Sequence, residues 1–365
     1  MNIDVTYHDL GRVHYRAGER IQELLEQDTR LGNRQHLIAL EHNPVFTFGK
    51  NADRSNLLWD KERLILKRIQ LFETSRGGDI TYHGPGQIVI YPIVNLQKIG
   101  ITLGDFVRGL EESMIRTADR FGIRSQRIKG NSGVWVKTNS GFSKLGALGL
   151  HVSKWITTHG IAFNVNPELG HYLGINPCGF EDRGVVSIYS LLENDAPSID
   201  EVKNLLVNEI RNQFGLKLLQ SPSPTLSISV IVYRETSDGI EILMMRRVPR
   251  DGGWWQSVTG MIDPEESKEH AAGREVFEET GLTGDLIDLD YEHTFVLPKP
   301  QLQLPYIFNV EHCFIFKPSE PLQPVRLSPL EHDSYRWVTV EEAKLLTPWD
   351  GMRIALDRLI DRIQK

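Results

Sequence analysis

The chain has 365 residues, more than one typical domain core holds, and its hydrophobic and charged fractions of 40% and 24% are those of a soluble globular protein. A formal net charge of −7 argues against non-specific binding to nucleic acid or to an anionic membrane, because both favour a basic face. Two cysteines exclude a disulfide framework and indicate a reducing compartment. The N-terminus lacks the pattern of a signal peptide and no apolar run is long enough for a membrane helix, so we expect a cytoplasmic protein of a bacterium or of an organelle of bacterial descent.

The first part of the chain predicts a mixture of strands and helices. Strands are expected at residues 37–40, 88–93, 134–137 and 148–152, the last two separated by a Gly-Phe turn, and an amphipathic helix is expected at 103–121. This order lacks the strict β-α-β alternation of a doubly wound sheet. The predicted fold class is therefore an α+β domain with a largely antiparallel sheet.

A domain boundary is predicted at residues 220–225, where two prolines and two serines lie in a short polar stretch that cannot continue a helix. Before it, residues 200–219 alternate apolar and charged side chains at helical spacing. After it, residues 226–233 are rich in β-branched side chains and predict a strand. We therefore expect a first domain at 1–219, a linker at 220–225 and a second domain at 226–365.

A glycine-rich stretch at residues 76–87 reads Arg-Gly-Gly-Asp-Ile-Thr-Tyr-His-Gly-Pro-Gly-Gln. Glycine pairs let a backbone approach a ligand closely. His83 is a polar group within this loop, and we expect it to have a specific partner. The stretch resembles the RGGxxTYHGPGQ motif of the octanoyl-[acyl-carrier-protein]:protein octanoyltransferases of lipoate biosynthesis. A lipoate–protein ligase would instead have RRxSGGGxVYHD, so the Gly-Pro-Gly-Gln ending favours the transferase.

Three later stretches agree with this resemblance, which covers roughly residues 5–215. Residues 143–149 resemble the family segment that carries its lysine, residues 158–166 its second glycine turn, and residues 176–179 the segment that carries its nucleophile. The resemblance implies a biotin/lipoyl-protein-ligase-like α+β domain with Cys178 and Lys144 as catalytic residues. It also implies acyl-substrate-binding residues, namely Arg76, Gly77, Gly78, Asp79, Ile80, Thr81, Tyr82, His83, Ala147, Leu148, Gly149, Gly160, Ile161 and Ala162. For His83 and His159, a structural hydrogen-bonding role is the alternative to shaping the substrate site.

The chemistry accounts for these residue types. Acyl transfer from a carrier thioester to a lysine amine can proceed through an enzyme thioester, and the attacking sulfur must be a thiolate. A Lys144 ammonium beside Cys178 would favour that thiolate and would exchange protons with the departing thiol and the incoming amine. Backbone N–H groups near Gly77–Gly78 and Cys178–Gly179 are candidates for an oxyanion hole. Cys313, within the apolar residues 312–316, is expected to be a buried packing residue.

The implied partners are octanoyl-acyl carrier protein and the lipoyl domains of 2-oxoacid dehydrogenases or of the glycine-cleavage H protein. Because the donor is already a thioester, the transferase requires no ATP and no cofactor. The first activity is thus expected to be protein lipoylation by octanoyl transfer.

The segment from Gly260 to Leu282 has a regular spacing: Gly260, five residues, Glu266, seven residues, and then Arg-Glu-Val-Phe-Glu-Glu-Thr-Gly-Leu. It resembles the Nudix box, Gx5Ex7REUxEExGU, at every defined position. The resemblance spans roughly residues 225–365 and implies an α/β/α Nudix sandwich. Within the box, Gly260, Glu266, Arg274 and Gly281 would have supporting roles.

The same spacing has a physical meaning. Glu275, Glu278 and Glu279 stand at i, i+3 and i+4 and therefore share one face of a helix, where they repel one another unless cations lie among them. Oxygen ligands suit Mg²⁺ or Mn²⁺, and such a metal can bridge a diphosphate and generate hydroxide. Arg274 precedes Glu278 by four residues and can orient it, and Gly281 ends the helix. A solvated acidic face is the alternative, but the full spacing favours a metal site.

Three segments outside the core of the box, residues 255–260, 331–337 and 348–350, are similar to those of dATP and dihydroneopterin-triphosphate pyrophosphohydrolases. This similarity adds Glu331 to the metal-binding carboxylates and assigns phosphate-side contacts to Arg246 and Thr259. It implies a nucleoside or pterin triphosphate as substrate. An exposed strand end is the alternative for Arg246, and a surface carboxylate is the alternative for Glu331.

Two other functions remain open. The Nudix fold could sense a nucleotide and regulate the transferase without turnover, although a binding-only module need not keep three hydrolytic carboxylates. The first domain could instead be an ATP-dependent lipoate–protein ligase, which would use free octanoate and ATP in place of octanoyl-acyl carrier protein.

Overall fold

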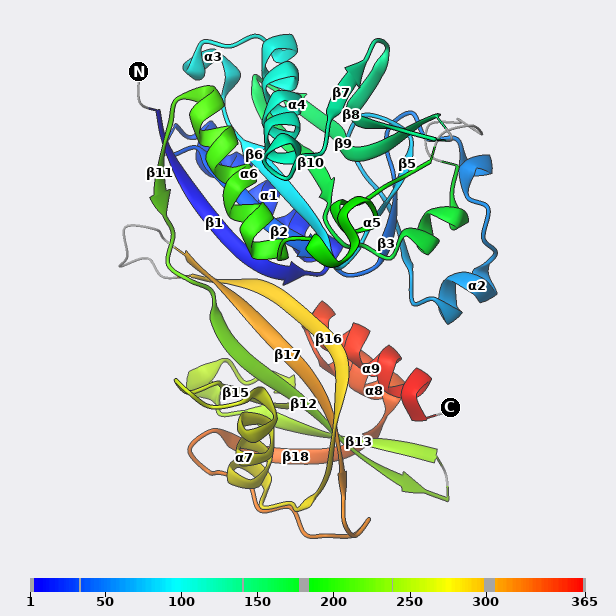
Figure 1. Ribbon diagram of the computed structural model, residues 1–365. Coiled ribbons are helices and arrows are strands. Elements are labelled where there is room, and N and C mark those ends of the chain that lie inside the picture. Colours follow the sequence, from blue (N-terminus) through cyan, green and yellow to red (C-terminus); the bar gives the residue numbers. More distant parts are fainter. Residues whose placement is uncertain are drawn as a thin grey trace. The chain divides into compact units, whose positions relative to one another are not determined.

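The computed structural model describes residues 3–32, 34–139, 141–176, 184–237, 239–298 and 306–363 (Figure 1). The chain divides into two compact units, Met1–Ser223 and Pro224–Lys365. Among the described residues, no helix combines the length and the apolar character that crossing a bilayer requires.

The first unit is built on a mixed sheet. Its strand order is β11 (Leu216–Gln220), β1 (Ile3–Val13), β2 (His36–His42), β6 (Gln87–Ile93), β10 (Ile156–Asn164), β9 (Gly141–Ser153), β8 (Asn131–Thr138) and β7 (Ser125–Ile128). The β11–β1 and β1–β2 pairings are parallel, and the other pairings are antiparallel. The predicted α+β class with a largely antiparallel sheet is therefore confirmed.

Helices cover both faces of this sheet. The helices α4 (Leu103–Arg120) and α6 (Ile199–Phe214) pack on one face and share its main apolar core (Figure 1). Helix α1 (Tyr15–Arg30) contacts β2, β6 and β10, and its buried side chains lie outside that core. Because side chains alternate between the two faces of a strand, α1 covers the opposite face.

A smaller sheet of order β4 (Gln70–Glu73), β3 (Val45–Phe48), β5 (Ile80–His83) forms a second core with short helices around it. Among the described residues of the first unit, the short helices are η1 (Arg54–Asn56), α2 (Lys61–Leu66), α3 (Leu96–Ile99), η2 (Leu169–Gly174), α5 (Ile188–Leu192) and η4 (Glu193–Asp195). The second core lies beside the glycine-rich stretch 76–87, whose middle is β5.

Three local predictions were wrong. The helix expected through residue 219 ends at Phe214, because Gly215 adopts a left-handed φ of 61° and the chain continues as β11. The glycine turn expected at residues 158–166 is mostly strand β10, paired on both sides. The Gly-Phe pair expected as a turn, Gly141–Phe142, instead begins β9.

The second unit is a sheet between two helical layers. Its path is β14 (Trp255–Gln256), β13 (Gly239–Arg247), β12 (Thr225–Thr236), β17 (Tyr306–Pro318) and β16 (Gly284–Pro298), with β15 (Val258–Met261) on β12 and β18 (His332–Thr339) on β13. A short helix, η5 (Pro249–Asp251), follows β13.

Alternate residues of β12 and β13 serve the two layers. Val230 and Leu243 pack with helix α7 (Lys268–Thr280), whereas Ile231 and Ile242 pack with α8 (Val340–Leu346) and α9 (Asp350–Ile363). The predicted α/β/α sandwich is confirmed. Cys313 is buried in the second of these cores, as expected of a packing residue.

Candidate active sites

A β-bulge turns Lys144 toward a hollow in the first unit. Trp135 pairs with Lys144, but the preceding Val134 pairs with Gly146, so β9 contains one extra residue, Leu145. Val134 belongs to the main core, and a Cβ on Gly146 would meet the core residue Met114. Lys144 therefore lies on the opposite face of the sheet, together with Ala147.

The hollow on that face measures about 930 Å³ with its open mouth. Its floor is made of small residues on two paired strands, Ala147 opposite Ala162 and Gly149 opposite Gly160. Every residue expected to bind the acyl substrate lines it except Tyr82. Tyr82 packs in the second core at 1% exposure, because strand alternation in β5 directs it away from its neighbours Thr81 and His83.

Lys144 is half-buried at one end of the hollow. Its ammonium lies 4.7 Å from the centre of the Trp135 ring, a cation–π contact. Its backbone N–H donates to the carbonyl of Gly184 at 2.9 Å, and its carbonyl accepts from the N–H of Val186 at 3.0 Å. Cys178 lies outside the described residues. Gly184, however, follows Cys178 by only six residues, so the chain that carries Cys178 returns beside Lys144.

The start of the glycine-rich stretch lies farther along β9. The Gly77 N–H donates to the carbonyl of Leu150 at 3.0 Å, so this N–H is engaged and cannot belong to the oxyanion hole that was expected near Gly77–Gly78. The Asp79 carboxylate accepts hydrogen bonds from the backbone N–H of Asp53 at 3.1 Å and from the Asn56 amide at 2.6 Å. Although Asp79 lines the hollow, its carboxylate fixes the surrounding loop.

Buried histidines and tyrosines lie on this side of the sheet. His83 is bound to Gln87 at 2.7 Å and stacks on Tyr15 at 6.2 Å between ring centres, while His42 is bound to the Tyr91 hydroxyl at 2.6 Å. Burial lowers the pKa of His42 to about 4 and holds the pKa of His83 well below its usual range. Both imidazoles are therefore neutral at pH 7.

Several lining residues had no signal in the sequence. Tyr15, Tyr91, Trp135 and Tyr172 come from elements far apart in the chain and fit the ordinary alternation of buried residues. Their place in the hollow depends on sheet order, which the sequence pattern does not specify.

In the second unit, the predicted box forms a strand, a loop and a helix. Ser267 caps the start of α7, and Gly281, at φ 68°, ends it as predicted. Gly260, in β15, lies directly against Glu275, and a Cβ there would be 2.0 Å from the Glu275 carboxyl carbon. Only glycine leaves room for this carboxylate.

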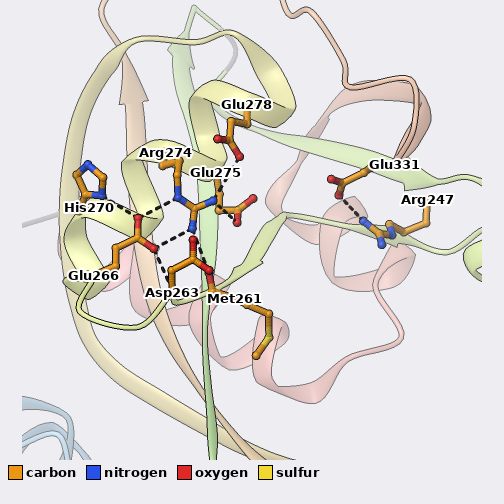
Figure 2. Close-up of polar contacts among 9 residues, drawn as sticks. All are labelled: Arg247, Met261, Asp263, Glu266, His270, Arg274, Glu275, Glu278 and Glu331. Carbon is orange, nitrogen blue, oxygen red and sulfur yellow. Dashed lines mark hydrogen bonds and ion pairs between the residues drawn. The ribbon is translucent and has the colours of Figure 1, made fainter.

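Arg274 lies among the carboxylates of the box (Figure 2). It donates two hydrogen bonds of 2.9 Å to Glu266 and one of 2.7 Å to Glu275, but its contact with Glu278 measures 3.3 Å. The expected contact of Arg274 with Glu278 is therefore present, but it is longer than the contacts with Glu266 and Glu275. The guanidinium fork fits Glu266 in a bidentate pair, and the nearer single contact goes to Glu275.

The glutamates of the helix differ in exposure. Glu278 is exposed and Glu275 is half-buried, whereas Glu279 is only 1% exposed. Burial raises the pKa of Glu275 and raises that of Glu279 to about 7. The three carboxylates thus share a helix but not an environment.

Glu279, Glu331 and His332 come together, with one donor atom of each within 4.8 Å of the others. His332 contacts one oxygen of Glu279 at 3.1 Å, and the other oxygen has no hydrogen-bond partner in the part of the chain that the structure describes. Glu331 also pairs with Arg247 at 2.7 Å (Figure 2). A buried carboxylate oxygen without a partner, beside a second carboxylate, fits a divalent cation.

His332 could not be assigned from the helix spacing, because it lies 53 residues from Glu279. The two residues expected on the phosphate side are both engaged. Arg246 is exposed and forms a bidentate pair with Asp333 at 2.7 and 2.9 Å, and Thr259 accepts from the Gln256 amide at 3.0 Å.

Comparison with known families assigns each unit. The model of the lipoyl protein ligase A/B catalytic domain matches residues 14–211, and that of the NUDIX domain matches residues 223–359. An octanoyltransferase of Myxococcus xanthus is 37% identical over 97% of this chain and 98% of its own length. An octanoyltransferase of Flavobacterium johnsoniae is 38% identical over 60% of this chain and its entire own length.

Solved structures resemble each unit separately. The Escherichia coli dihydroneopterin triphosphate pyrophosphohydrolase is 28% identical, covers 38% of this chain and 95% of its own, and has a TM-score of 0.32. A bipartite lipoate protein ligase of Thermoplasma acidophilum is 14% identical, covers 60% of this chain and 87% of its own, and has a TM-score of 0.46.

Proposed function

Because the chain belongs to the lipoyl protein ligase A/B catalytic family and carries a NUDIX domain, we propose that its first unit transfers octanoyl from acyl carrier protein to the lysine of a lipoyl domain. The observation that carries this proposal is Lys144, which reaches one end of an acyl-sized hollow where the chain returns from Cys178. The resemblance of residues 76–87 to the transferase motif favours a thioester donor over an activated free acid.

Cys178 is proposed as the nucleophile. Its thiolate attacks the carbonyl carbon of the octanoyl thioester, and the C–S bond to the carrier breaks as the carrier thiol takes up a proton. The lysine amine of the lipoyl domain then attacks the enzyme thioester, forms the amide and releases the Cys178 thiolate. Lys144 is the group that supplies a proton in the first step and accepts one in the second.

Transfer without ATP tests this proposal. We expect purified protein to octanoylate a lipoyl domain from octanoyl-acyl carrier protein alone, and Lys144→Ala to lower the rate at least about 100-fold, the range for loss of a general acid–base group. Lys137→Ala changes an exposed lysine on the neighbouring strand β8 and is the matched control. Octanoylation only from free octanoate and ATP would favour the ligase alternative and defeat the proposal.

For the second unit we propose Mg²⁺-dependent hydrolysis of a phosphoanhydride bond in a nucleoside or pterin triphosphate. Glu279 and Glu331 would hold the metal together with Glu275, and His332 would orient Glu279 through their hydrogen bond. The metal, when bound, neutralises phosphate charge and makes its water acidic. Arg274 holds Glu275 in place, and Gly260 leaves the space that this carboxylate occupies.

A nucleotide panel with Mg²⁺ tests this activity through release of pyrophosphate or phosphate. Glu279→Gln should abolish turnover, whereas Glu269→Gln, an exposed change in the first turn of the same helix, should leave it unchanged. Binding without release across the panel, dATP included, would favour the nucleotide-sensor alternative.

A further inference from the structure

Three large apolar side chains are exposed beside the segment that leads to Cys178. They belong to Leu58, Leu66 and Leu173, whose exposed fractions are 60%, 71% and 72%. The Leu58 N–H donates to the carbonyl of Gly174 at 2.8 Å, so the chain around Leu58 lies directly against the end of η2. Exposed apolar side chains scattered singly need no explanation, but a group of them marks a surface that binds another molecule.

The fold holds these side chains outward. Leu57 and Ile175 pair with each other and pack in the second core, so Leu58, the next residue, faces away from that core. On α2, Leu64 packs in the same core, and Leu66 lies two residues later, on another side of the helix. The leucines are therefore exposed because their neighbours are firmly packed.

Cationic side chains surround these leucines. Residues 57–68 carry four cations and two carboxylates, in a chain whose formal net charge is −7. Arg63 lies 4.8 Å from the centre of the Trp59 ring, which is 6.1 Å from the His171 ring of η2. All four cations are exposed, and within the described parts of the chain none forms an ion pair; they are Lys61, Arg63, Lys67 and Arg68.

The same surface adjoins the reacting end of the acyl hollow. Tyr172 of η2 lines the hollow, and Leu173 follows it in the chain. The N–H of Asn176 donates to the carbonyl of Asn56 at 2.8 Å, and Cys178 is two residues farther along, a span of at most about 7 Å. A molecule bound here is therefore close to the proposed nucleophile, and it does not block the hollow, because none of the exposed leucines lines it.

We propose that this surface binds the acyl carrier protein that delivers octanoyl; the inference rests on the proposed octanoyl transfer. The surface, called the α2 surface, is defined by Leu58, Lys61, Arg63, Leu66, Lys67 and Leu173. Its cations call for an acidic partner, and its leucines call for apolar side chains at the centre of the contact. An acidic carrier protein has the complementary chemistry, and the opposite charges also speed the encounter.

The position of the α2 surface favours the carrier over the lipoyl domain. The lipoyl lysine is a short side chain, so its domain must cover the mouth of the hollow for the amine to reach the enzyme thioester. The carrier instead presents the acyl group at the end of a long prosthetic arm, so it can bind to one side. The α2 surface lies to one side in this sense.

Charge reversal on this surface tests the proposal in the full chain. Lys61→Glu combined with Lys67→Glu should raise the apparent KM for octanoyl-acyl carrier protein at least tenfold and change kcat less than twofold. The apparent KM for octanoyl-pantetheine, a thioester without the protein, should stay within twofold, as should that for the lipoyl domain. The effect on the carrier should diminish in about 1 M salt, where the screening length is about 3 Å.

Matched controls make the same changes elsewhere in the first unit. Lys98→Glu combined with Arg124→Glu alters the net charge equally at two exposed cations outside the α2 surface, and it should keep every apparent KM within twofold. Leu66→Ser should raise the apparent KM for the carrier about threefold, whereas Leu31→Ser, at an equally exposed leucine after α1, should not.

An unchanged apparent KM for the carrier in the charge-reversed variant would overturn the inference. A rise for the lipoyl domain alone would assign the surface to the other substrate, and equal rises for the carrier and for octanoyl-pantetheine would show a damaged site; either overturns it. So would self-association of wild type that Leu66→Ser abolishes, because the surface would then join copies of this chain. If wild type transfers octanoyl from neither thioester, the proposed function itself fails, which is a distinct result.

Discussion

Single residues determine where the carboxylates of the NUDIX box can lie. Gly260 and Glu275 are in contact although they belong to a strand and to a helix, and Arg274 holds the same carboxylate from the side. The spacing of the box is a local feature of the sequence, but in the fold it places Gly260 directly against Glu275. The glycine therefore contributes to the site without any functional group.

Gly260→Ala should test this contact. The added Cβ would lie 2.0 Å from the Glu275 carboxyl carbon, so the carboxylate must move, and we expect hydrolysis to fall at least tenfold. Gly273→Ala, on α7 with no atom within 4 Å of its Cβ, is the matched control and should keep activity while stabilising the helix by about 0.5–1 kcal/mol. Equal activity of both variants would show that Glu275 is not needed where it lies.

At the scale of elements, predictions succeeded where the signal was local. Helix α7 follows from the spacing and the caps of residues 267–281, and strand β12 follows from its β-branched residues. The end of α6 was missed because the helical spacing of apolar residues happens to continue into β11, and Gly215 is the only local sign of the change. Side-chain patterns alone did not locate that end.

The candidate sites depend on contacts that no local pattern carries. Lys144 faces the hollow because of the bulge at Leu145, and Tyr82 faces away from it because β5 is a strand rather than a loop. His332 meets Glu279 through the pairing of β18 with β13. Family resemblance identified Lys144 without this geometry, whereas it did not place His332 in the metal group.

Strand β10 is the element on which the acyl hollow depends, and Gly160→Ala tests its packing. A Cβ on Gly160 would lie 2.0 Å from the carbonyl oxygen of Ile90 in the neighbouring strand β6, so β10 and β6 must separate. We expect the free energy of unfolding of the first unit to fall by roughly 1–3 kcal/mol.

Gly104→Ala is the control for this change, because it lies at the exposed start of α4 with its nearest neighbour 3.8 Å away. It should leave stability unchanged or raise it slightly. The stability of both variants can be measured by chemical unfolding and by calorimetry. Equal stability of Gly160→Ala and wild type would contradict the close approach of the two strands.

At the scale of the whole molecule, the two units have separate apolar cores and are expected to unfold in two transitions. The first unit buries several histidines without charge. Burial lowers the pKa of His8 to about 3 and that of His42 to about 4, against an ordinary value of 6.5. These groups couple the stability of the first unit to pH.

The sign of this coupling follows from the folded pKa values, which lie below the unfolded ones. Between pH 6.5 and about 4 the unfolded chain binds more protons, so the stability contribution is complete above pH 6.5 and is lost as the pH falls toward the folded pKa. Each such histidine should lower the unfolding free energy by about 2 kcal/mol between pH 7 and pH 5. In calorimetry, the transition of the first unit is the one that Gly160→Ala shifts. We expect its midpoint temperature to be lower at pH 5 than at pH 7. An unchanged or higher midpoint at pH 5 would contradict these buried neutral rings.

We propose that octanoyl passes through a covalent bond to Cys178 beside Lys144. Intact-protein mass spectrometry after incubation with octanoyl-acyl carrier protein, in the absence of any lipoyl domain, tests it directly. We expect one added octanoyl group on wild type and on the control Cys313→Ala, and none on Cys178→Ala. An octanoyl group retained by Cys178→Ala would contradict it, because another residue would then be the nucleophile.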